Sequence, residues 1–261
     1  MATYRLHLEY DGSAFHGWQV QPGRRTVQAE VEAALGRLLG ERICLVGAGR
    51  TDAGVHALGQ VASFESERMQ EPRRLLRGCH GLLPADVHVW AAGVTSPGFS
   101  ARASATWRRY VYRMVRQPSP LRRHFGHVLR WPVDEQAMAA AAAGLLGTHD
   151  FTAFVAHRSA ARGRDCTVLR SEIHAEAQEV RFEIVANRFL YNMVRRLSGA
   201  LLEIGRGRLA AAELERILER RDTGRGGPCL PAHGLYLVEV GYPEDPQFAS
   251  SAVVDGMRWS P

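Results

Sequence analysis

The sequence predicts an α+β fold built from two ferredoxin-like halves, each with the element order β-α-β-β-α-β, related by pseudo-two-fold symmetry and carrying mixed or antiparallel sheets. Short segments that alternate apolar and polar residues, as half-buried strands do, are interleaved with segments whose apolar residues recur at helical spacing. This order occurs once before residue 96 and recurs after residue 106 with one additional helix. The 261 residues suffice for two modest domains.

The first half contains four expected strands and two expected helices. Thr26 is a good N-cap for the first helix, whose apolar residues share one face, and Gly40 suits its C-terminal end. Pro72 can occupy the first turn of the second helix. The expected strands lie at Leu6–Tyr10, Arg42–Val46, Gly59–Phe64 and Val87–Val94, and the helices at Val27–Leu38 and Pro72–Arg77.

The second half repeats the topology without sequence identity to the first. Its expected strands lie at Trp107–Val115, Val168–Ala177, Glu179–Ala186 and Leu235–Tyr242, and its expected helices at Asp134–Leu146, Phe189–Ile204 and Ala210–Arg220. Small residues at Ser96–Thr106 indicate a link between the halves. We therefore expect domains at residues 1–106 and 107–245, followed by a polar tail at 246–261.

The composition favours an intracellular partner rich in phosphate. The net charge is +6, and all 33 basic residues are arginine, whose planar guanidinium suits phosphates and bases. Genome composition is an alternative explanation for the missing lysine. No apolar run has the length of a membrane span and the N-terminus has no signal-peptide pattern, so we expect a cytoplasmic protein. The four cysteines are far apart and show no metal-ligand spacing with histidine, so we expect reduced thiols and no metal.

One loop, GAGRTDAGVHA at Gly47–Ala57, carries the chemistry-bearing pattern. It is no phosphate-binding P-loop, which requires a lysine. It is no dinucleotide fingerprint, because Asp52 stands where the third glycine belongs. Two interpretations stay open from the pattern alone. The loop is a turn in which Asp52 caps backbone amides, or it binds a ligand closely and Asp52, held ionised by a nearby arginine such as Arg50, is a nucleophile.

The chain resembles the tRNA pseudouridine synthase A family in ordered motifs that span residues 4–242. GRTDAGVHA at 49–57 resembles the signature loop of that family. The other matching motifs are EYDGSAFHGWQVQ at 9–21, TVQAEVEAAL at 26–35, FSARASATWRRYVY at 99–112, GTHDFTAF at 147–154, ANRFLYNMVRRLSGALLEIG at 186–205 and HGLYLVEV at 233–240. Two stretches depart from the family pattern: Gly78–Pro84 lacks the expected asparagines, and the Ala160–Cys166 loop is longer.

The resemblance implies an isomerase that converts uridine to pseudouridine in the anticodon stem-loop of tRNA, at family positions 38, 39 and 40. It implies a central RNA-binding cleft, a homodimer as the active form and a reaction that needs no cofactor. It implies that Asp52 is the nucleophile, attacking either the ribose carbon or uracil C6, and that Arg195 is its ion-pair partner. It places Tyr110 against the uracil, where its hydroxyl is a candidate for removing the C5 proton, and Arg50 where it aids base flipping. The further RNA contacts implied are Phe99, Arg102, Arg158, Arg162 and Arg164.

Plainer interpretations accompany these assignments. A tyrosine in an alternating strand, such as Tyr110, is usually a core residue, and a helix arginine such as Arg195 is usually solvated. Two other functions remain alternatives: a tRNA-binding protein without enzymatic activity on the same scaffold, and a metal-dependent hydrolase that uses Asp52 on a nucleoside or phosphate.

Overall fold

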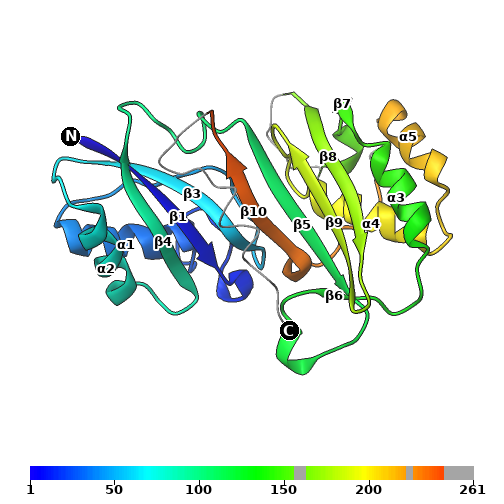
Figure 1. The fold of residues 1–261 in the computed structure, drawn as a ribbon, viewed down its shortest axis with the longest axis horizontal. Helices are drawn as coiled ribbons and strands as arrows, with labels where there is room; N and C mark the ends of the chain where they lie inside the picture. The colour runs from blue at the N-terminus through cyan, green and yellow to red at the C-terminus, as the bar shows by residue number, and fades with distance from the viewer. Residues whose placement is uncertain (156–162, 222–225, 244–261) are drawn as a thin grey trace.

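The computed structural model describes residues 1–155, 163–221 and 226–243. Its strands form one mixed ten-stranded sheet. Figure 1 shows α1 and α2 at the end of the molecule that carries the N-terminus, and α3, α4 and α5 at the opposite end. The expectation of two similar α+β halves is confirmed, because each half has the strand order of a ferredoxin-like unit, as the next two paragraphs describe.

The first half has the spatial strand order β4-β1-β3-β2. Its helices α1 and α2 contact each other, and α2 packs on β4. The bounds are β1 (Ala2–Tyr10), η1 (Gly12–Ala14), α1 (Val27–Leu39), β2 (Val46–Gly47), β3 (His56–Ser66), α2 (Pro72–Leu82) and β4 (Val87–Thr95).

The second half has the equivalent order β10-β5-β9-β8, so its last strand occupies the place that β4 has in the first half. Two helices, α4 and α5, precede that strand, as expected, and α3 packs on β8 and α4. The bounds are β5 (Trp107–Val115), η2 (Pro120–Arg122), β6 (His127–Val128), α3 (Glu135–Ala143), β7 (Gly147–Asp150), η3 (Thr152–Phe154), β8 (Asp165–Ala175), β9 (Glu179–Ala186), α4 (Met193–Gly205), α5 (Ala211–Arg220), η4 (Ala232–Gly234) and β10 (Leu235–Gly241).

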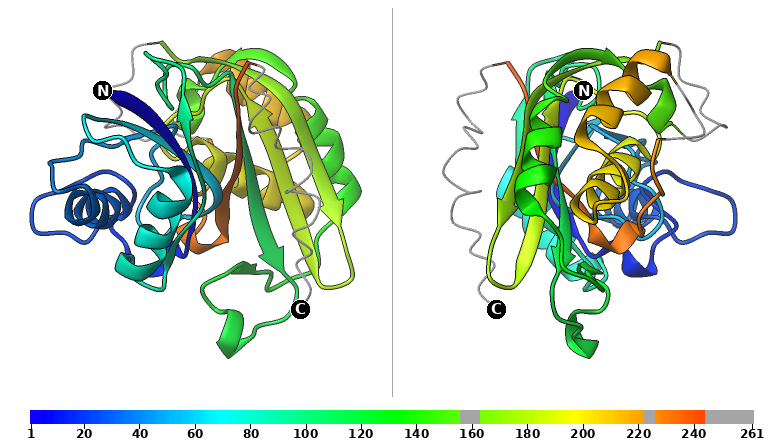
Figure 2. Two further views of the ribbon diagram at one scale, coloured as in Figure 1. Left: turned by 60° about the vertical axis from the view of Figure 1, so that its left-hand side comes forward. Right: turned by 90° about the vertical axis from the view of Figure 1, so that its right-hand side faces the viewer.

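Strand β10 joins the two halves. It lies between β3 and β5, antiparallel to β5 and parallel to β3, but it pairs with β3 only at Tyr236–His56 and Leu237–Ala57. Figure 2 shows β10 running between the two halves of the sheet. Further along the same edge of β3, Ala62 and Ser63 pair with β2 instead. The chain between β2 and β3, residues 48–55, therefore lies at the junction of the halves.

The expected strand at Arg42–Val46 is wrong except at its last residue. Ile43 and Leu45 are buried, which produces the alternating pattern. However, the backbone of Leu45 bonds to helix α1: its N–H donates to Glu32 Oε1 at 2.8 Å, and its carbonyl accepts from Gln28 Nε2 at 3.0 Å. The segment packs against α1 rather than entering the sheet, so alternation here records burial without strand pairing.

Several helix boundaries also differ from expectation, and α3 ends at Ala143 instead of Leu146. Helix α2 continues past the expected end at Arg77 to Leu82. Gly78 lies inside it and faces α1, where a Cβ would lie 2.5 Å from Leu38. Helix α4 begins at Met193 instead of Phe189, because Asn192 has a left-handed backbone with φ of 62°. All four cysteines are free thiols, as expected. Among the described residues, no helix is long and apolar enough to cross a bilayer.

Candidate active site

The loop at residues 48–55 is fixed on the first half by hydrogen bonds along its length. Its carbonyl groups accept from Gln60 Nε2 at Gly49, at 2.9 Å, and from Trp18 N–H at Thr51, at 3.0 Å. The hydroxyls of Tyr10 and Thr51 share a buried hydrogen bond of 2.8 Å. Such bonds hold a functional loop in one geometry before a ligand arrives.

The motif DGSAFHGW packs against this loop. Its first glycine, Gly12, is required because the backbone of Val55 approaches it closely. A Cβ at Gly12 would lie 2.0 Å from the carbonyl oxygen of Val55. The Gly12 N–H donates to Nδ1 of His56, so the ring proton is on Nε2, which donates to the His124 carbonyl at 2.8 Å. Burial lowers the pKa of His56. His56 is thus a neutral residue whose two ring nitrogens hold this turn in place.

Asp52 pairs with Arg195 across the junction of the two halves. Arg195 Nη1 lies 3.4 Å from Asp52 Oδ2, and the side chains are only 22% and 18% exposed for Asp52 and Arg195 respectively. Within the described residues, Oδ1 of Asp52 has no hydrogen-bond partner. One carboxylate oxygen is therefore held and the other is available for chemistry.

Arg195 is held in place by two further groups. Its Nε donates to the Leu230 carbonyl at 2.7 Å, and its Nη1 donates to Asn192 Oδ1 at 3.0 Å. Asn192 is the residue with the left-handed backbone at the start of α4, a conformation that asparagine tolerates better than most residues. The turn into α4 thus sets the position of the guanidinium that faces Asp52.

Two opposing effects set the protonation of Asp52. Burial is the larger effect and raises the pKa of the carboxyl above its ordinary value, while the charge and hydrogen bond of Arg195 lower it. Arg195, the ion-pair partner that the resemblance implied, therefore compensates for burial only in part. A desolvated carboxylate that keeps one cationic partner is more reactive than a hydrated one.

Asp52 lines a pocket of about 800 Å³ between the halves. Tyr110, from β5, is 7% exposed, and its ring meets that of Phe189 edge-on with centroids 4.9 Å apart. Burial, with the nearby Tyr10 and the charge of Asp52, raises the pKa of Tyr110 well above its ordinary value, so its hydroxyl is protonated at neutral pH. The lining residues are Ala48, Gly49, Arg50, Thr51, Asp52, Val55, Arg102, Arg108, Tyr110, Arg188, Phe189, Leu190, Tyr191, Asn192, Met193, Val194 and Leu235.

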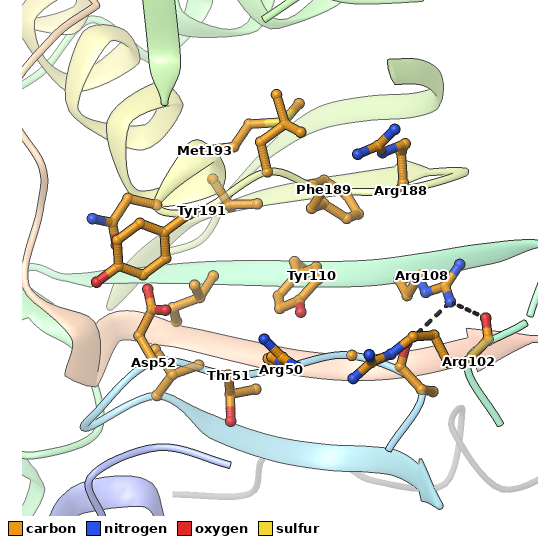
Figure 3. A pocket seen from close by; sticks show the side chains of 17 residues that line it. Arg50, Thr51, Asp52, Arg102, Arg108, Tyr110, Arg188, Phe189, Tyr191 and Met193 are labelled. Carbon is orange, nitrogen blue, oxygen red and sulfur yellow. Dashed lines mark hydrogen bonds between the residues drawn. The ribbon is translucent and has the colours of Figure 1, made fainter. Parts of the chain in front are cut away.

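Four arginines line the same pocket: Arg50, Arg102, Arg108 and Arg188. In the view of Figure 3, Asp52 and Tyr191 lie at one end of the pocket and Arg102, Arg108 and Arg188 at the other. None of the four has a carboxylate within 4.0 Å among the described residues. Their uncompensated charge suits a polyanion at this end of the pocket.

The structure brings together five of the residues that the sequence singled out, since Arg50, Asp52, Arg102 and Tyr110 line the pocket and Arg195 reaches it through Asp52. It does not bring Phe99 there. Phe99 packs against Tyr242, at 5.2 Å between ring centroids, and lies under the guanidinium of Arg5.

Of the implied RNA contacts Arg158, Arg162 and Arg164, only Arg164 is described, and it does not line the pocket. Arg164 lies beside Asp150, whose pKa its charge helps to lower. Arg158 and Arg162 lie outside the described residues, as does the tail at 246–261.

Among the pocket residues that sequence reasoning missed are Arg108, Arg188 and Phe189. Arg108 could have been predicted from the pattern, because residues 108 and 110 of an alternating strand lie on the same face of the sheet. Phe189 was missed because a helix was expected from residue 189, where the structure has an irregular segment and a turn before α4.

Within the described residues, Glu172, His174 and Glu183 form a group with metal-ligand spacing. They lie on the face of the sheet opposite Tyr110, and both carboxylates pair with Arg170. This group contributes nothing to the pocket.

Comparison with known proteins identifies the family. A sequence model described as tRNA pseudouridine synthase matches residues 7–95 and 141–243. A tRNA pseudouridine synthase A from Moorella thermoacetica is 43% identical over 246 residues, which cover 93% of this chain and 100% of that protein. The chain belongs to the tRNA pseudouridine synthase A family. The enzyme of that name from Methylococcus capsulatus is 41% identical over 263 residues, covering 98% of this chain and 97% of the relative.

The family resemblance drawn from the motifs is therefore confirmed, and the chain spans almost the whole length of these tRNA pseudouridine synthase A relatives. Among solved structures, an archaeal box H/ACA sRNP Nop10–Cbf5 complex aligns with a TM-score of 0.36 and 15% identity, covering 76% of this chain and 44% of that one.

Proposed function

We propose that the protein isomerises uridine to pseudouridine in the anticodon stem-loop of tRNA, at family positions 38, 39 and 40. The observation that carries this proposal is the Asp52 carboxylate, which opens onto an aromatic pocket between the halves and is held there by Arg195. Membership of the tRNA pseudouridine synthase A family supplies the reaction class.

The reaction exchanges one bond of the ribose for another. The N1–C1′ bond breaks, the uracil turns, and a C5–C1′ bond forms. The C5 proton leaves and N1 gains a proton, so no oxidant, reductant or second substrate is needed. Oδ1 of Asp52 attacks C1′ or uracil C6, while Arg195 holds Oδ2 and stabilises the ionised form. The nucleotide must first leave its stack, at a cost of a few kcal/mol.

The aromatic residues serve the detached base. Tyr110 and Phe189 present apolar surface on which a loose uracil can turn without escaping. Because the raised pKa keeps the Tyr110 hydroxyl protonated, it accepts the C5 proton only while passing its own proton to a neighbour. Tyr110 thus belongs to the last step of the reaction.

The arginines serve the RNA backbone. Arg50 stands next to the catalytic residue in the loop and fills the space that the flipped nucleotide leaves in the stem. Arg102 and Arg188 bind the flanking phosphates, which position the substrate without reading its sequence.

The proposal extends to the assembly. Residues 1–106 act as the domain that carries Asp52, and residues 107–245 as the domain that carries Tyr110 and Arg195. An anticodon arm is larger than one pocket, so the active form is a cytoplasmic homodimer whose copies share the tRNA. Light scattering during size-exclusion chromatography, with and without tRNA, measures this stoichiometry.

The test of the activity is nucleoside mapping on an unmodified tRNA transcript that carries uridines at positions 38–40. Wild-type protein should form pseudouridine, Asp52→Asn should bind the transcript without converting it, and the exposed variant Glu172→Gln should behave as wild type. Release of free uracil would instead indicate a hydrolase. Loss of tRNA binding by Asp52→Asn, with no pseudouridine from wild type, would indicate a binding protein.

A further inference from the structure

Arg108 makes an unusual set of contacts. Its Nη1 donates to the carbonyls of Ala105 and Asn187 at 3.2 and 2.9 Å, and its Nη2 donates to those of Ala48 and Arg102, both at 3.0 Å. Each terminal nitrogen thus donates two hydrogen bonds to main-chain oxygens. Figure 3 draws the bonds to Ala48 and Arg102.

These four carbonyls belong to three segments that meet at the pocket. Ala48 opens the loop that carries Asp52, and Asn187 opens the segment that leads to Phe189 and Arg195. Arg102 and Ala105 belong to the link between the halves. A single side chain therefore ties the first half, the link and the second half together beside the reacting groups.

The hydrogen bond from Arg108 to the Ala48 carbonyl comes from the opposite half of the molecule, unlike the other hydrogen bonds that fix the loop. Gln60, Tyr10 and Trp18 fix the loop to the first half, to which it already belongs. Arg108 is in the second half, in β5, two residues before Tyr110. It therefore fixes the distance between the Asp52 loop and the second half, which carries Tyr110 and Arg195.

We propose that Arg108 is a positioning residue, which holds the Asp52 loop in register with Tyr110 and Arg195 and does not itself bind RNA. This inference rests on the proposed isomerase function. The main rival is a phosphate contact, because Arg108 lines the same pocket as the other three arginines. The rival is disfavoured because the four terminal N–H groups already have acceptors in the protein.

The decisive variant is Arg108→Lys. Lysine keeps the positive charge but offers three donors on one nitrogen, so it cannot span four carbonyls that are divided between two nitrogens. Its matched control is Arg109→Lys, one residue along β5. Arg109 points to the opposite face of the sheet, where it pairs with Glu183 and Glu239. A second variant, Arg108→Met, removes the charge as well.

We expect the single-turnover rate of Arg108→Lys at saturating tRNA to fall by about 100-fold, because a displacement of about 1 Å in the reacting geometry has that effect. The Kd for tRNA should stay within about threefold of wild type, since the charge is kept. Arg109→Lys should keep both the rate and the Kd. Melting temperatures of all variants show whether each is folded.

Hydrogen exchange measures the positioning directly and needs no activity. In Arg108→Lys, the amides of Ala48 and Val55 should exchange about tenfold faster, while those in β1 and β4 keep their wild-type rates. This readout still applies if wild-type protein makes no pseudouridine, so failure of the proposed function and failure of this inference are distinguishable.

Two results would overturn the inference. One is a wild-type rate and wild-type exchange in Arg108→Lys, which would show that the charge alone matters. The other is a large rise in the Kd of both Arg108 variants with an unchanged rate at saturation, which would make Arg108 a phosphate contact.

Discussion

Asp52 and Arg195 are 143 positions apart in the sequence, and the fold brings Arg195 Nη1 to 3.4 Å from Asp52 Oδ2. The first residue belongs to the loop before β3 and the second to the first turn of α4, so the pair exists only when the two halves are joined. The reactivity of the carboxylate therefore depends on the relation between the halves.

Replacing Asp52 should stabilise the empty protein at neutral pH. Burial raises the pKa of Asp52 in the folded state, so folding favours the protonated form and loses stability as the pH rises through the folded pKa. Asp52→Asn has no charge to bury and should melt higher than wild type, by about 2–4 °C for each kcal/mol relieved.

The difference in melting temperature should narrow as the pH falls from about 7 towards about 3, because the carboxyl becomes protonated first in the folded state and then in the unfolded state. Differential scanning calorimetry across this range measures it, with Glu172→Gln as the control. A constant or widening difference at low pH would contradict the raised pKa of Asp52.

Removing Arg195 should shift the pH dependence of the reaction. Arg195 lowers the pKa of Asp52, so Arg195→Met should raise that pKa further. The rising acidic limb of the single-turnover rate should then move to higher pH, because the close cation that favours the ionised carboxylate is gone. The exposed variant Arg216→Gln serves as the control. An unshifted limb with a uniformly lower rate would mean that Arg195 acts on the RNA instead.

Tyr110→Phe should slow the last step while leaving tRNA binding intact. The variant keeps the ring that packs on Phe189 and loses only the hydroxyl. With tRNA labelled with tritium at uridine C5, tritium release should become slower and show a larger isotope effect, because removal of the C5 proton becomes rate-limiting. Tyr110→Ala should also lose the stacking surface, worth about 1–3 kcal/mol per base. Wild-type tritium release by Tyr110→Phe would confine Tyr110 to a packing role.

Arg102→Gln and Arg188→Gln should each weaken tRNA binding in a salt-dependent way. Each removes one uncompensated cation from the pocket. The slope of log K against log salt should fall by about 0.7–0.9 per variant, with little dependence on the tRNA sequence. Fluorescence titrations at several salt concentrations measure the slope, and Arg216→Gln should leave it unchanged. An unchanged slope for Arg188→Gln would remove that residue from the interface.

The sequence predicted most of the fold because its strands bury one face. Strands β5 and β9 were predicted with the bounds observed, and Thr26 and Gly40 flank α1 as expected. The prediction failed where side chains are buried without their backbone pairing in the sheet. Ile43 and Leu45 are buried in this way, and the backbone of Leu45 bonds to α1. The short strands β6 and β7 were missed because two to four residues carry no detectable period.

The motifs predicted which residues belong to the candidate site, but not how those residues are arranged in space. Asp52, Tyr110 and Arg195 follow from the family resemblance, whereas burial, exposure and pairing depend on contacts between distant segments. Arg108 illustrates the limit, because four carbonyl acceptors have no sequence signature. The position of α4 likewise depended on one backbone angle, at Asn192.

The central place of β10 has a consequence for biosynthesis. Because the strand that bonds to both β3 and β5 is Leu235–Gly241, a growing chain completes its first half, with Asp52, long before the element that attaches the second half has been translated. A chain that stalls or is cleaved ahead of this strand has Asp52 but lacks the strand that bonds to both halves. We therefore expect truncated products to lack the Asp52–Arg195 pair and only a nearly finished polypeptide to act on RNA.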